Sequence, residues 1–170
     1  MYGGPVGVEV KAVGSRRDRR EFIELPFRLH ATSEHWIPPI RLERKLFHNR
    51  RMNAYFKHAE AQEFLARRGK RVVGRISAQF DRAYDDEHGP GTGMFGFLEL
   101  DDDGEVARAL LDAARGWLAG HGRSHMIGPM DYTMNDECGV LIEGFDREPM
   151  IKQPWHPPYY AQRAEEAGLG

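Results

Sequence analysis

The run Asn135-Asp136-Glu137-Cys138-Gly139 carries the side chains best suited to chemistry in this chain of 170 residues. A carboxylate such as Glu137 can act as a general base that takes a proton from a nucleophile, directly or through water. Cys138 is the only cysteine and a potential nucleophile, but the sequence identifies no histidine or aspartate that would activate it. The run also suits a polar turn with a buried thiol, so both interpretations stay open.

Tyrosines form a second group of candidates. Tyr132 precedes the acidic run, and Tyr159 and Tyr160 follow two prolines near the end of the sequence. A phenol with a pKa of ~10 can donate a proton to a strongly basic leaving group. The alternative is that Tyr159 and Tyr160 pack with Trp155 and the prolines as an aromatic corner, because aromatic residues supply much of the packing area in proteins.

Metal-binding patterns are weak in this sequence. His121 and His125 are four residues apart, but Gly122 lies between them, where the preceding helix should already have ended. The stretch from Glu99 to Gly104 resembles the start of a calcium-binding loop, yet the twelfth position is a leucine instead of the required glutamate. We therefore expect no metal site.

Charged residues are unevenly divided along the chain. Residues 1–80 carry 17 Lys and Arg against 8 Asp and Glu, a net charge of +9, and residues 81–170 carry 7 against 18, a net charge of −11. This division excludes a uniformly basic nucleic-acid binder and an acidic disordered tail. Either the halves neutralise each other in the fold, or the basic half binds phosphate groups of a cofactor, an anionic lipid or nucleic acid. The basic residues concerned are Arg16, Arg17, Arg19, Arg20, Arg41, Arg44, Lys45, Arg50, Arg51 and Lys57.

The elements that must position these side chains follow from the hydrophobic spacing. Alternation predicts a strand over residues 8–13, and helical spacing predicts a helix over 16–29 with Ser15 or Asp18 as its N-cap. Pro26 lies inside this helix and is expected to kink it or to split it into two short pieces.

The remainder of the chain predicts an α+β fold, because consecutive strands outnumber strand–helix–strand units. One right-handed crossover is expected, from strand 94–100 through the amphipathic helix 105–119 to strand 124–130. Asp103 is the expected N-cap of that helix, and Gly120 or Gly122 its end. The other predicted elements are a helix over 41–47, a hairpin of 60–68 and 71–80, a polar loop over 81–93, an apolar segment over 139–142 and a helix over 158–166.

This order of elements resembles the GNAT superfamily of N-acetyltransferases. Several stretches make the resemblance more specific and point to a bacterial GNAT-like family of largely unassigned function, whose members are about twice as long. The stretches are 22–29, 36–39, 58–60, 96–99, 128–130, 135–139 and 157–160. The resemblance implies a mixed, mostly antiparallel sheet with helices on both faces, and an enzyme that moves an acyl group from acyl-CoA to an amine.

The resemblance also implies roles for the candidate residues. Glu137 and Glu99 would be catalytic bases, although Glu99 could equally be an exposed charge at the end of its strand. Tyr159 and Tyr160 would protonate the departing thiolate. The cofactor-binding candidates are Phe97, Leu98, Leu100 and Gly104. The backbone groups of the first three, which lie on the predicted strand, would pair with the pantetheine arm of the cofactor. The substrate-binding candidates are Tyr132, Asn135 and Cys138.

One departure from the resemblance concerns the turn before the crossover helix. GNAT enzymes bind the CoA pyrophosphate there with a glycine-rich loop, whereas this sequence has Asp101, Asp102 and Asp103 followed by Gly104. Three carboxylates repel a diphosphate at close range. The turn therefore supports a second hypothesis, a non-catalytic GNAT-like module that serves as a scaffold or recognition surface of a larger protein.

The chain as a whole is expected to be one domain over 1–170, with the last strands of the sheet lying beyond it. No segment reaches the ~20 consecutive apolar residues of a membrane span. Residues 1–6 lack the basic start and apolar stretch of a signal peptide, so a cytoplasmic location is expected. A small molecule or a lipid would supply the acceptor amine, and a homodimer is an open alternative to the monomer.

Overall fold

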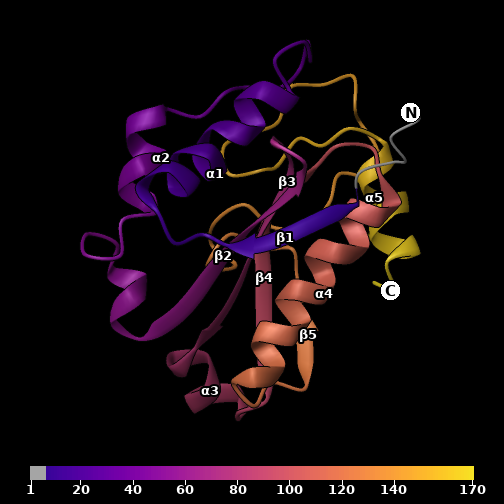
Figure 1. Ribbon diagram of the computed structural model, residues 1–170. Helices are drawn as coiled ribbons and strands as arrows, with labels where there is room; N and C mark the ends of the chain where they lie inside the picture. Colours follow the sequence, from indigo (N-terminus) through magenta and orange to yellow (C-terminus); the bar gives the residue numbers. More distant parts are fainter. Residues whose placement is uncertain (1–6) are drawn as a thin grey trace.

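The computed structural model describes residues 7–170 and contains one five-stranded sheet with the strands in chain order (Figure 1). Pairing is antiparallel from β1 to β4 and parallel between β4 and β5. The strands are β1 (Val8–Ala12), β2 (Ala59–Arg68), β3 (Arg71–Asp81), β4 (Thr92–Leu100) and β5 (His125–Ile127). Residues 1–6, on which the expectation about a signal peptide rests, lie outside the described residues.

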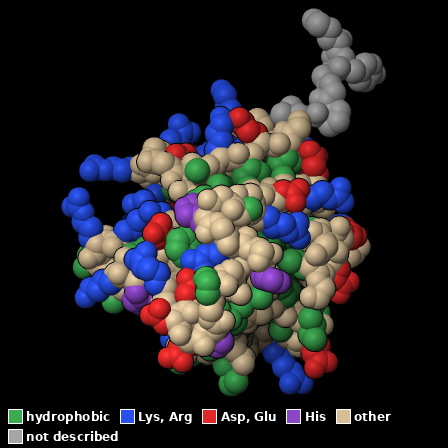
Figure 2. Space-filling model, turned by 90° about the horizontal axis from the view of Figure 1, so that it is seen from below, with side chains coloured by type: hydrophobic (Ala, Val, Ile, Leu, Met, Phe, Trp, Pro, Cys, Tyr) green, Lys and Arg blue, Asp and Glu red, His purple; other side chains and the backbone are tan. Residues whose placement is uncertain are grey.

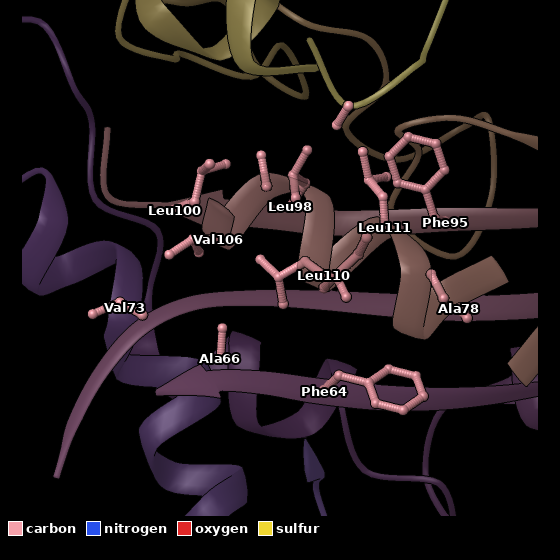
Figure 3. Close-up of a cluster of buried hydrophobic side chains, with 14 of the residues drawn as sticks. Phe64, Ala66, Val73, Ala78, Phe95, Leu98, Leu100, Val106, Leu110 and Leu111 are labelled. Carbon is pink, nitrogen blue, oxygen red and sulfur yellow. The ribbon is translucent and has the colours of Figure 1, made fainter. Parts of the chain in front are cut away.

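Helices cover both faces of the sheet, as expected. They are α1 (Arg16–Leu29), α2 (Arg41–Phe47), α3 (Arg82–His88), α4 (Gly104–Gly120) and α5 (Tyr159–Glu166), with a 3-10 turn η1 (Ala54–Lys57). The crossover helix α4 packs its apolar stripe on one face, where Leu110 and Leu111 meet Phe64 and Phe95 (Figure 3). A second cluster, with Phe22 of α1 and Phe97, fills the space between α1 and the opposite face.

Helix α1 is continuous through Pro26, so the expected split into two short pieces is wrong. Ser15 and Asp18 form a reciprocal capping box at its start. A proline inside a helix leaves the carbonyl of the residue four positions earlier without its N–H donor. Here that carbonyl belongs to Phe22, and the Arg75 guanidinium donates to it at 2.8 Å. The sheet therefore supplies the hydrogen bond that the proline removes.

One further expectation needs correction. The predicted loop 81–93 contains α3, because the Asp81 side chain caps it by accepting from the Ala83 N–H at 2.8 Å. Residues 139–142, predicted as an apolar segment, lie outside the named strands, and the neighbouring chain forms an isolated bridge between Met130 and Cys138.

Strands β4 and β5 separate partway along β4. Their pairing ends at Met94 and Ile127, although β4 continues to Leu100. Strand β5 is accordingly shorter than the predicted 124–130. Along the unpaired part, β4 bulges against β3, and Phe97 has a φ of 50°, in the left-handed region. This separation leaves one edge of β4 open for side chains from the following loop.

Candidate active site

Glu99, at the end of β4, is held by side chains from two helices. His30 Nε2, next to the end of α1, lies 2.8 Å from Glu99 Oε2, and the Tyr160 hydroxyl of α5 donates to the same oxygen at 2.7 Å. Arg75 Nη2 lies 3.7 Å from Glu99 Oε1. Burial would raise the Glu99 pKa, but the hydrogen bond and charge of His30, together with the charge of Arg75, lower it to about 2. Glu99 is therefore a fixed anion.

A second carboxyl group enters the same region from the loop after β5. Asp131 Oδ1 accepts a hydrogen bond from the Phe97 N–H at 2.8 Å, at the bulge of β4. Burial and the nearby charge of Glu137 raise the Asp131 pKa to about 8. The Asp131 N–H donates to the Glu137 carbonyl oxygen at 2.8 Å, so these two residues are joined through the backbone. Asp131 thus holds a proton at neutral pH.

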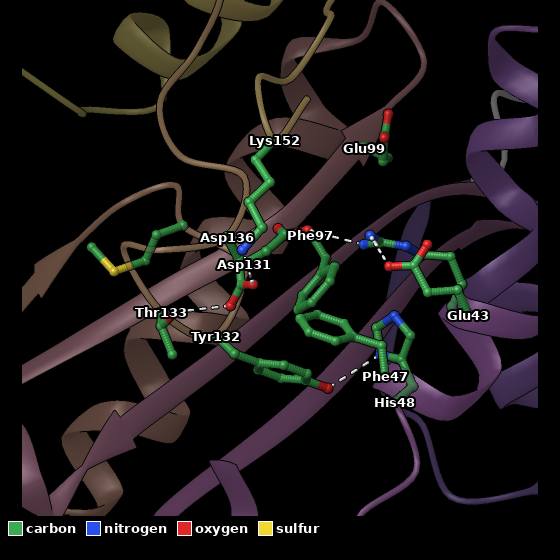
Figure 4. Close-up of polar contacts among 12 residues, drawn as sticks. Glu43, Phe47, His48, Phe97, Glu99, Asp131, Tyr132, Thr133, Asp136 and Lys152 are labelled. Carbon is green, nitrogen blue, oxygen red and sulfur yellow. Dashed lines mark hydrogen bonds and ion pairs between the residues drawn. The ribbon is translucent and has the colours of Figure 1, made fainter. Parts of the chain in front are cut away.

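Glu137 is the third carboxyl group, and burial raises its pKa, with Arg44 opposing the shift. Arg44 reaches in from α2, and its Nη1 lies 3.9 Å from Asp131 Oδ2. Figure 4 shows Asp131 beside Phe97, with Glu99 further along the same strand. The carboxyl groups of Glu99, Asp131 and Glu137 therefore surround one cavity, and the pKa is lowered in the first and raised in the other two.

This cavity, of about 70 Å³, lies between α1, α2, β4 and the loop after β5. Its polar lining consists of the three carboxyl groups with Arg44, Arg75 and Gln153. Its apolar lining is Ile23, Pro26, Phe27, Trp36, Ile37, Pro39, Pro149 and Trp155. A small adjoining hollow of about 30 Å³ is lined by Phe97, Leu98, Pro129 and His156. The arrangement suits proton transfer in a site partly shielded from water.

The structure brings two of the four predicted catalytic residues, Glu99 and Glu137, to one cavity. Tyr160 lies behind Glu99, where its hydroxyl also accepts from the Leu100 N–H at 3.0 Å. The Tyr159 hydroxyl donates to the Leu100 carbonyl oxygen at 2.8 Å. Neither tyrosine lines the cavity. The backbone groups of Leu100, predicted to pair with the pantetheine arm, thus have tyrosine partners.

The predicted substrate-binding residues lie apart from this cavity. Tyr132 is buried in the second cluster, where its hydroxyl donates to Glu63 Oε1 at 3.2 Å and lies 3.1 Å from His48 Nδ1. Asn135 and Cys138 are exposed, so the expectation of a buried thiol is wrong. Asp136, next to Glu137, accepts from the Thr133 hydroxyl at 2.9 Å, which is the turn interaction that the alternative interpretation expects.

The acidic turn before α4 is neutralised by arginines. Asp101 pairs with Arg71 at 2.9 Å, Asp102 with Arg163 at 2.8 Å and Asp103 with Arg68 at 2.7 Å. Asp103 is also the N-cap of α4, as predicted, and accepts from the Glu105 and Val106 N–H groups. The donors that would bind a diphosphate at this helix start already have a carboxylate partner. Gly104 lies in this turn, away from the cavity lining.

Four residues of the site, His30, Arg44, Arg75 and Asp131, were not predicted to line it, and of these only Arg44 was named before, among the basic residues that could bind phosphate groups. They lie on four different segments, and no sequence spacing connects them. Pro26 was the one signal in the sequence that could have indicated Arg75. A proline inside a helix leaves a backbone carbonyl without its N–H donor, so another donor, such as an arginine, has to bind that carbonyl. Within residues 7–170 no group of three or more His, Cys, Asp or Glu side chains is arranged to hold a metal ion.

Comparison with known proteins supports an acyltransferase-like fold. No model of a known protein family matches the chain. A bacterial ceramide synthase of Caulobacter vibrioides is 41% identical over 162 residues, covering 95% of this chain and 42% of that protein. Protein YghO of Escherichia coli is 36% identical over 159 residues, covering 94% and 40%. The chain thus spans about two fifths of the length of the curated relatives it matches.

A solved structure identifies the fold. The aminoglycoside acetyltransferase meta-AAC0020 from an uncultured soil metagenomic sample, in complex with sisomicin, matches with a TM-score of 0.50 at 14% identity. The match covers 73% of this chain and 78% of that one. The fold is GNAT-like, as the sequence resemblance implied. In the described part of the chain, no helix is long and apolar enough to cross a membrane.

Proposed function

We propose that this chain catalyses the transfer of an acyl group from a thioester, of the acyl-CoA type, to the amino group of a lipid-like amine. The observation that carries the proposal is the convergence of Glu99, Asp131 and Glu137 on one cavity beside the open edge of β4. Similarity to a ceramide synthase supports it, since a ceramide is a long-chain amino alcohol acylated on nitrogen. The GNAT-like fold is consistent with acyl transfer.

In the proposed reaction, the amine nitrogen attacks the thioester carbonyl, so that a C–N bond forms and the C–S bond breaks. Glu137 takes the proton that the nitrogen loses, because its raised pKa makes it a stronger base than an exposed carboxylate. The departing thiolate needs a proton, and Asp131, with a pKa of about 8, matches a thiol pKa of ~8.5. Asp131 then regains its proton from Glu137 or from solvent.

The proposed roles of the other predicted residues change accordingly. Glu99, with a pKa of about 2, is too weak a base and serves as a fixed anion that orients Arg75 and His30. Burial raises the Tyr159 pKa to about 12, which makes it a poor acid for a thiolate. Tyr160 is a positioning residue, because its hydroxyl joins Glu99 to the backbone of Leu100.

The thioester arm would lie beside β4 in the hollow lined by Phe97 and Leu98, where β5 has diverged. Its phosphates would lie away from the acidic turn, since Asp103 already occupies the N–H groups at the start of α4. Arg44 and Arg75, which line the cavity, are the nearest cations for the oxyanion that develops on the thioester carbonyl.

A Glu137→Gln variant tests the proposal. We expect the rate of amide formation from a long-chain acyl-CoA and a long-chain amino alcohol, followed by mass spectrometry, to fall by about 100-fold or more. Glu143→Gln, which changes an exposed carboxylate of the next loop, is the matched control and should keep full activity. Calorimetric titration with acetyl-CoA and longer acyl-CoAs measures binding separately.

The non-catalytic hypothesis makes the opposite prediction. If a folded Glu137→Gln variant keeps the turnover of the unchanged chain, or if the chain binds no acyl-CoA at millimolar concentration, the proposal of an acyltransferase site fails.

A further inference from the structure

One surface of the molecule carries positive charge that no described carboxylate neutralises. A shallow hollow of about 450 Å³ is lined by Arg16, Arg19 and Arg20 of α1 and Lys45 of α2, together with Ile23 and Glu24. In the described range 7–170, the four basic side chains form no ion pair. The neighbouring carboxylates are engaged elsewhere, since Glu24 pairs with Arg41, and Glu21 with Arg17 and Arg67.

The helix beside this hollow exposes apolar side chains. Helix α2 has no buried residue, and Ile40, Leu42 and Leu46 keep 70%, 65% and 42% of their surface exposed. Leu42, Lys45 and Leu46 are spaced at i, i+3 and i+4, so they share one side of the helix. We call the six residues Arg16, Arg19, Arg20, Leu42, Lys45 and Leu46 the α1–α2 face. In Figure 2, Lys and Arg side chains project from the left edge, the side on which Figure 1 places α1 and α2.

We propose that the α1–α2 face binds the surface of a bilayer that contains anionic lipids. Apolar side chains on a short surface helix can enter the head-group region, while adjacent cations meet the lipid phosphates. Nucleic acid would use the same cations but gains little from exposed leucines, since it is bound through phosphate contacts and stacking on aromatic rings. A protein partner would also cover the leucines, but four uncompensated cations beside them fit a surface of dense negative charge better.

The position of this face matters for the cavity. On its other side, α2 contributes Arg44 and Phe47 to a hollow that leads to Glu137 and is bordered by Met150 and Ile151. Met150 and Ile151 are 71% and 95% exposed. Only the width of α2, ~10 Å, would then separate this hollow from a bilayer held against the α1–α2 face. This last step rests on the proposed function, whereas the docking itself does not.

Vesicle binding tests the inference directly. The full chain is mixed with vesicles of phosphatidylglycerol and phosphatidylcholine, or of phosphatidylcholine alone, and the bound fraction is measured by sedimentation. We expect binding to the anionic vesicles only, and expect it to weaken steeply as salt is added. Two double variants test the two parts of the face: Arg20→Glu with Lys45→Glu reverses two cations, and Leu42→Ser with Leu46→Ser removes two apolar side chains. We expect each double variant to lower the partition coefficient onto anionic vesicles by about tenfold or more.

The matched control reverses two exposed cations elsewhere, Lys70→Glu in the β2–β3 turn with Arg108→Glu on α4, and should change binding less than twofold. Absence of binding to anionic vesicles, equal binding to both kinds, or an equal loss in the control would overturn the inference. So would tight RNA binding without vesicle binding, or self-association that depends on Leu42 and Leu46. Acylation of a water-soluble amine by the face variants separates a failure of docking from a failure of the catalytic proposal.

Discussion

At the scale of single residues, Arg75 connects the backbone of α1 with the chemistry of the cavity. Its guanidinium donates to the Phe22 carbonyl, which Pro26 leaves without a helical partner, and it also faces Glu99. One buried side chain therefore supplies both the hydrogen bond that the helix lacks and a positive charge in the site. Because each contact is made by a different part of the guanidinium fork, a lysine at this position could not replace it.

Asp131 leads to a prediction about pH. Its pKa is about 8 in the folded chain, whereas in the unfolded chain it has the ordinary aspartate pKa of 3.8. Between these values the folded state binds more protons, so this group lowers stability as the pH rises, by up to about 1.4 kcal/mol per pH unit. We expect Asp131→Asn, which keeps an acceptor for the Phe97 N–H, to become increasingly stable relative to the unchanged chain from pH 5 to pH 8.

Urea unfolding of both proteins across this range measures the effect. The difference between them is the informative quantity, because His156, whose pKa burial lowers to about 4, contributes a slope of opposite sign below its ordinary pKa. Asp146→Asn, an exposed change in the loop, should leave the pH profile unaltered. A constant difference between Asp131→Asn and the unchanged chain would mean that Asp131 ionises normally.

At the scale of elements, the loop after β5 reaches the site only because two glycines let it lie directly on β4. A Cβ atom at Gly96 would lie 1.9 Å from the Met130 carbonyl oxygen, and one at Gly128 would lie 2.4 Å from the Phe95 carbonyl oxygen. The Met130 N–H donates to the Phe95 carbonyl oxygen at 2.8 Å, which places the following residue, Asp131, against the bulge. Contact between backbones thus sets the geometry of the carboxyl groups.

Gly96→Ala should therefore separate these two segments. Because the clash involves backbone atoms that cannot rotate away, we expect a loss of about 3 kcal/mol or more in the free energy of unfolding. Gly116→Ala on α4, where an added Cβ meets nothing within 4 Å, should instead stabilise the chain by about 0.5–1 kcal/mol. Urea denaturation of both variants measures the contrast, and an unchanged Gly96→Ala would contradict the close packing of this loop.

At the scale of the whole molecule, ion pairs join the basic and the acidic halves of the sequence. Most are at the end of β4 and the start of α4, and Figure 2 shows acidic and basic side chains interspersed over one face. The pairs are Arg68–Asp103, Arg68–Glu105, Arg71–Asp101 and Arg75–Glu99. Neutralisation across the fold explains the charge division, apart from the cations of the α1–α2 face.

These pairs predict a dependence of stability on salt. Attraction between oppositely charged halves is screened as ionic strength rises, so we expect the urea midpoint to be lower in about 0.5 M than in about 0.02 M KCl. The paired change Arg71→Gln with Asp101→Asn removes one of the pairs and should reduce this salt dependence. A midpoint that stays constant or rises with KCl would show that the pairs contribute little to folding.

The sequence by itself determined most elements of the fold, because period-two and helical hydrophobic spacing and capping residues are local signals. The β2–β3 hairpin and the crossover helix with its Asp103 cap follow from it, and the structure confirms them. It also indicated Glu99 and Glu137, which lie at the end of a strand and in a polar run. Local spacing failed at Pro26, since the donor that keeps α1 intact lies 53 residues from Phe22.

Only the tertiary structure decided which candidate residues line the cavity and which hold the lining residues in place. His30, Arg44, Arg75 and Asp131 are distant in sequence and meet only because α1, α2 and the loop after β5 pack around the end of β4. Their burial then sets which carboxyl group is ionised, with Glu99 held as an anion and Asp131 protonated. Protonation depends on desolvation and on neighbouring charge, and neither quantity exists until the chain has folded.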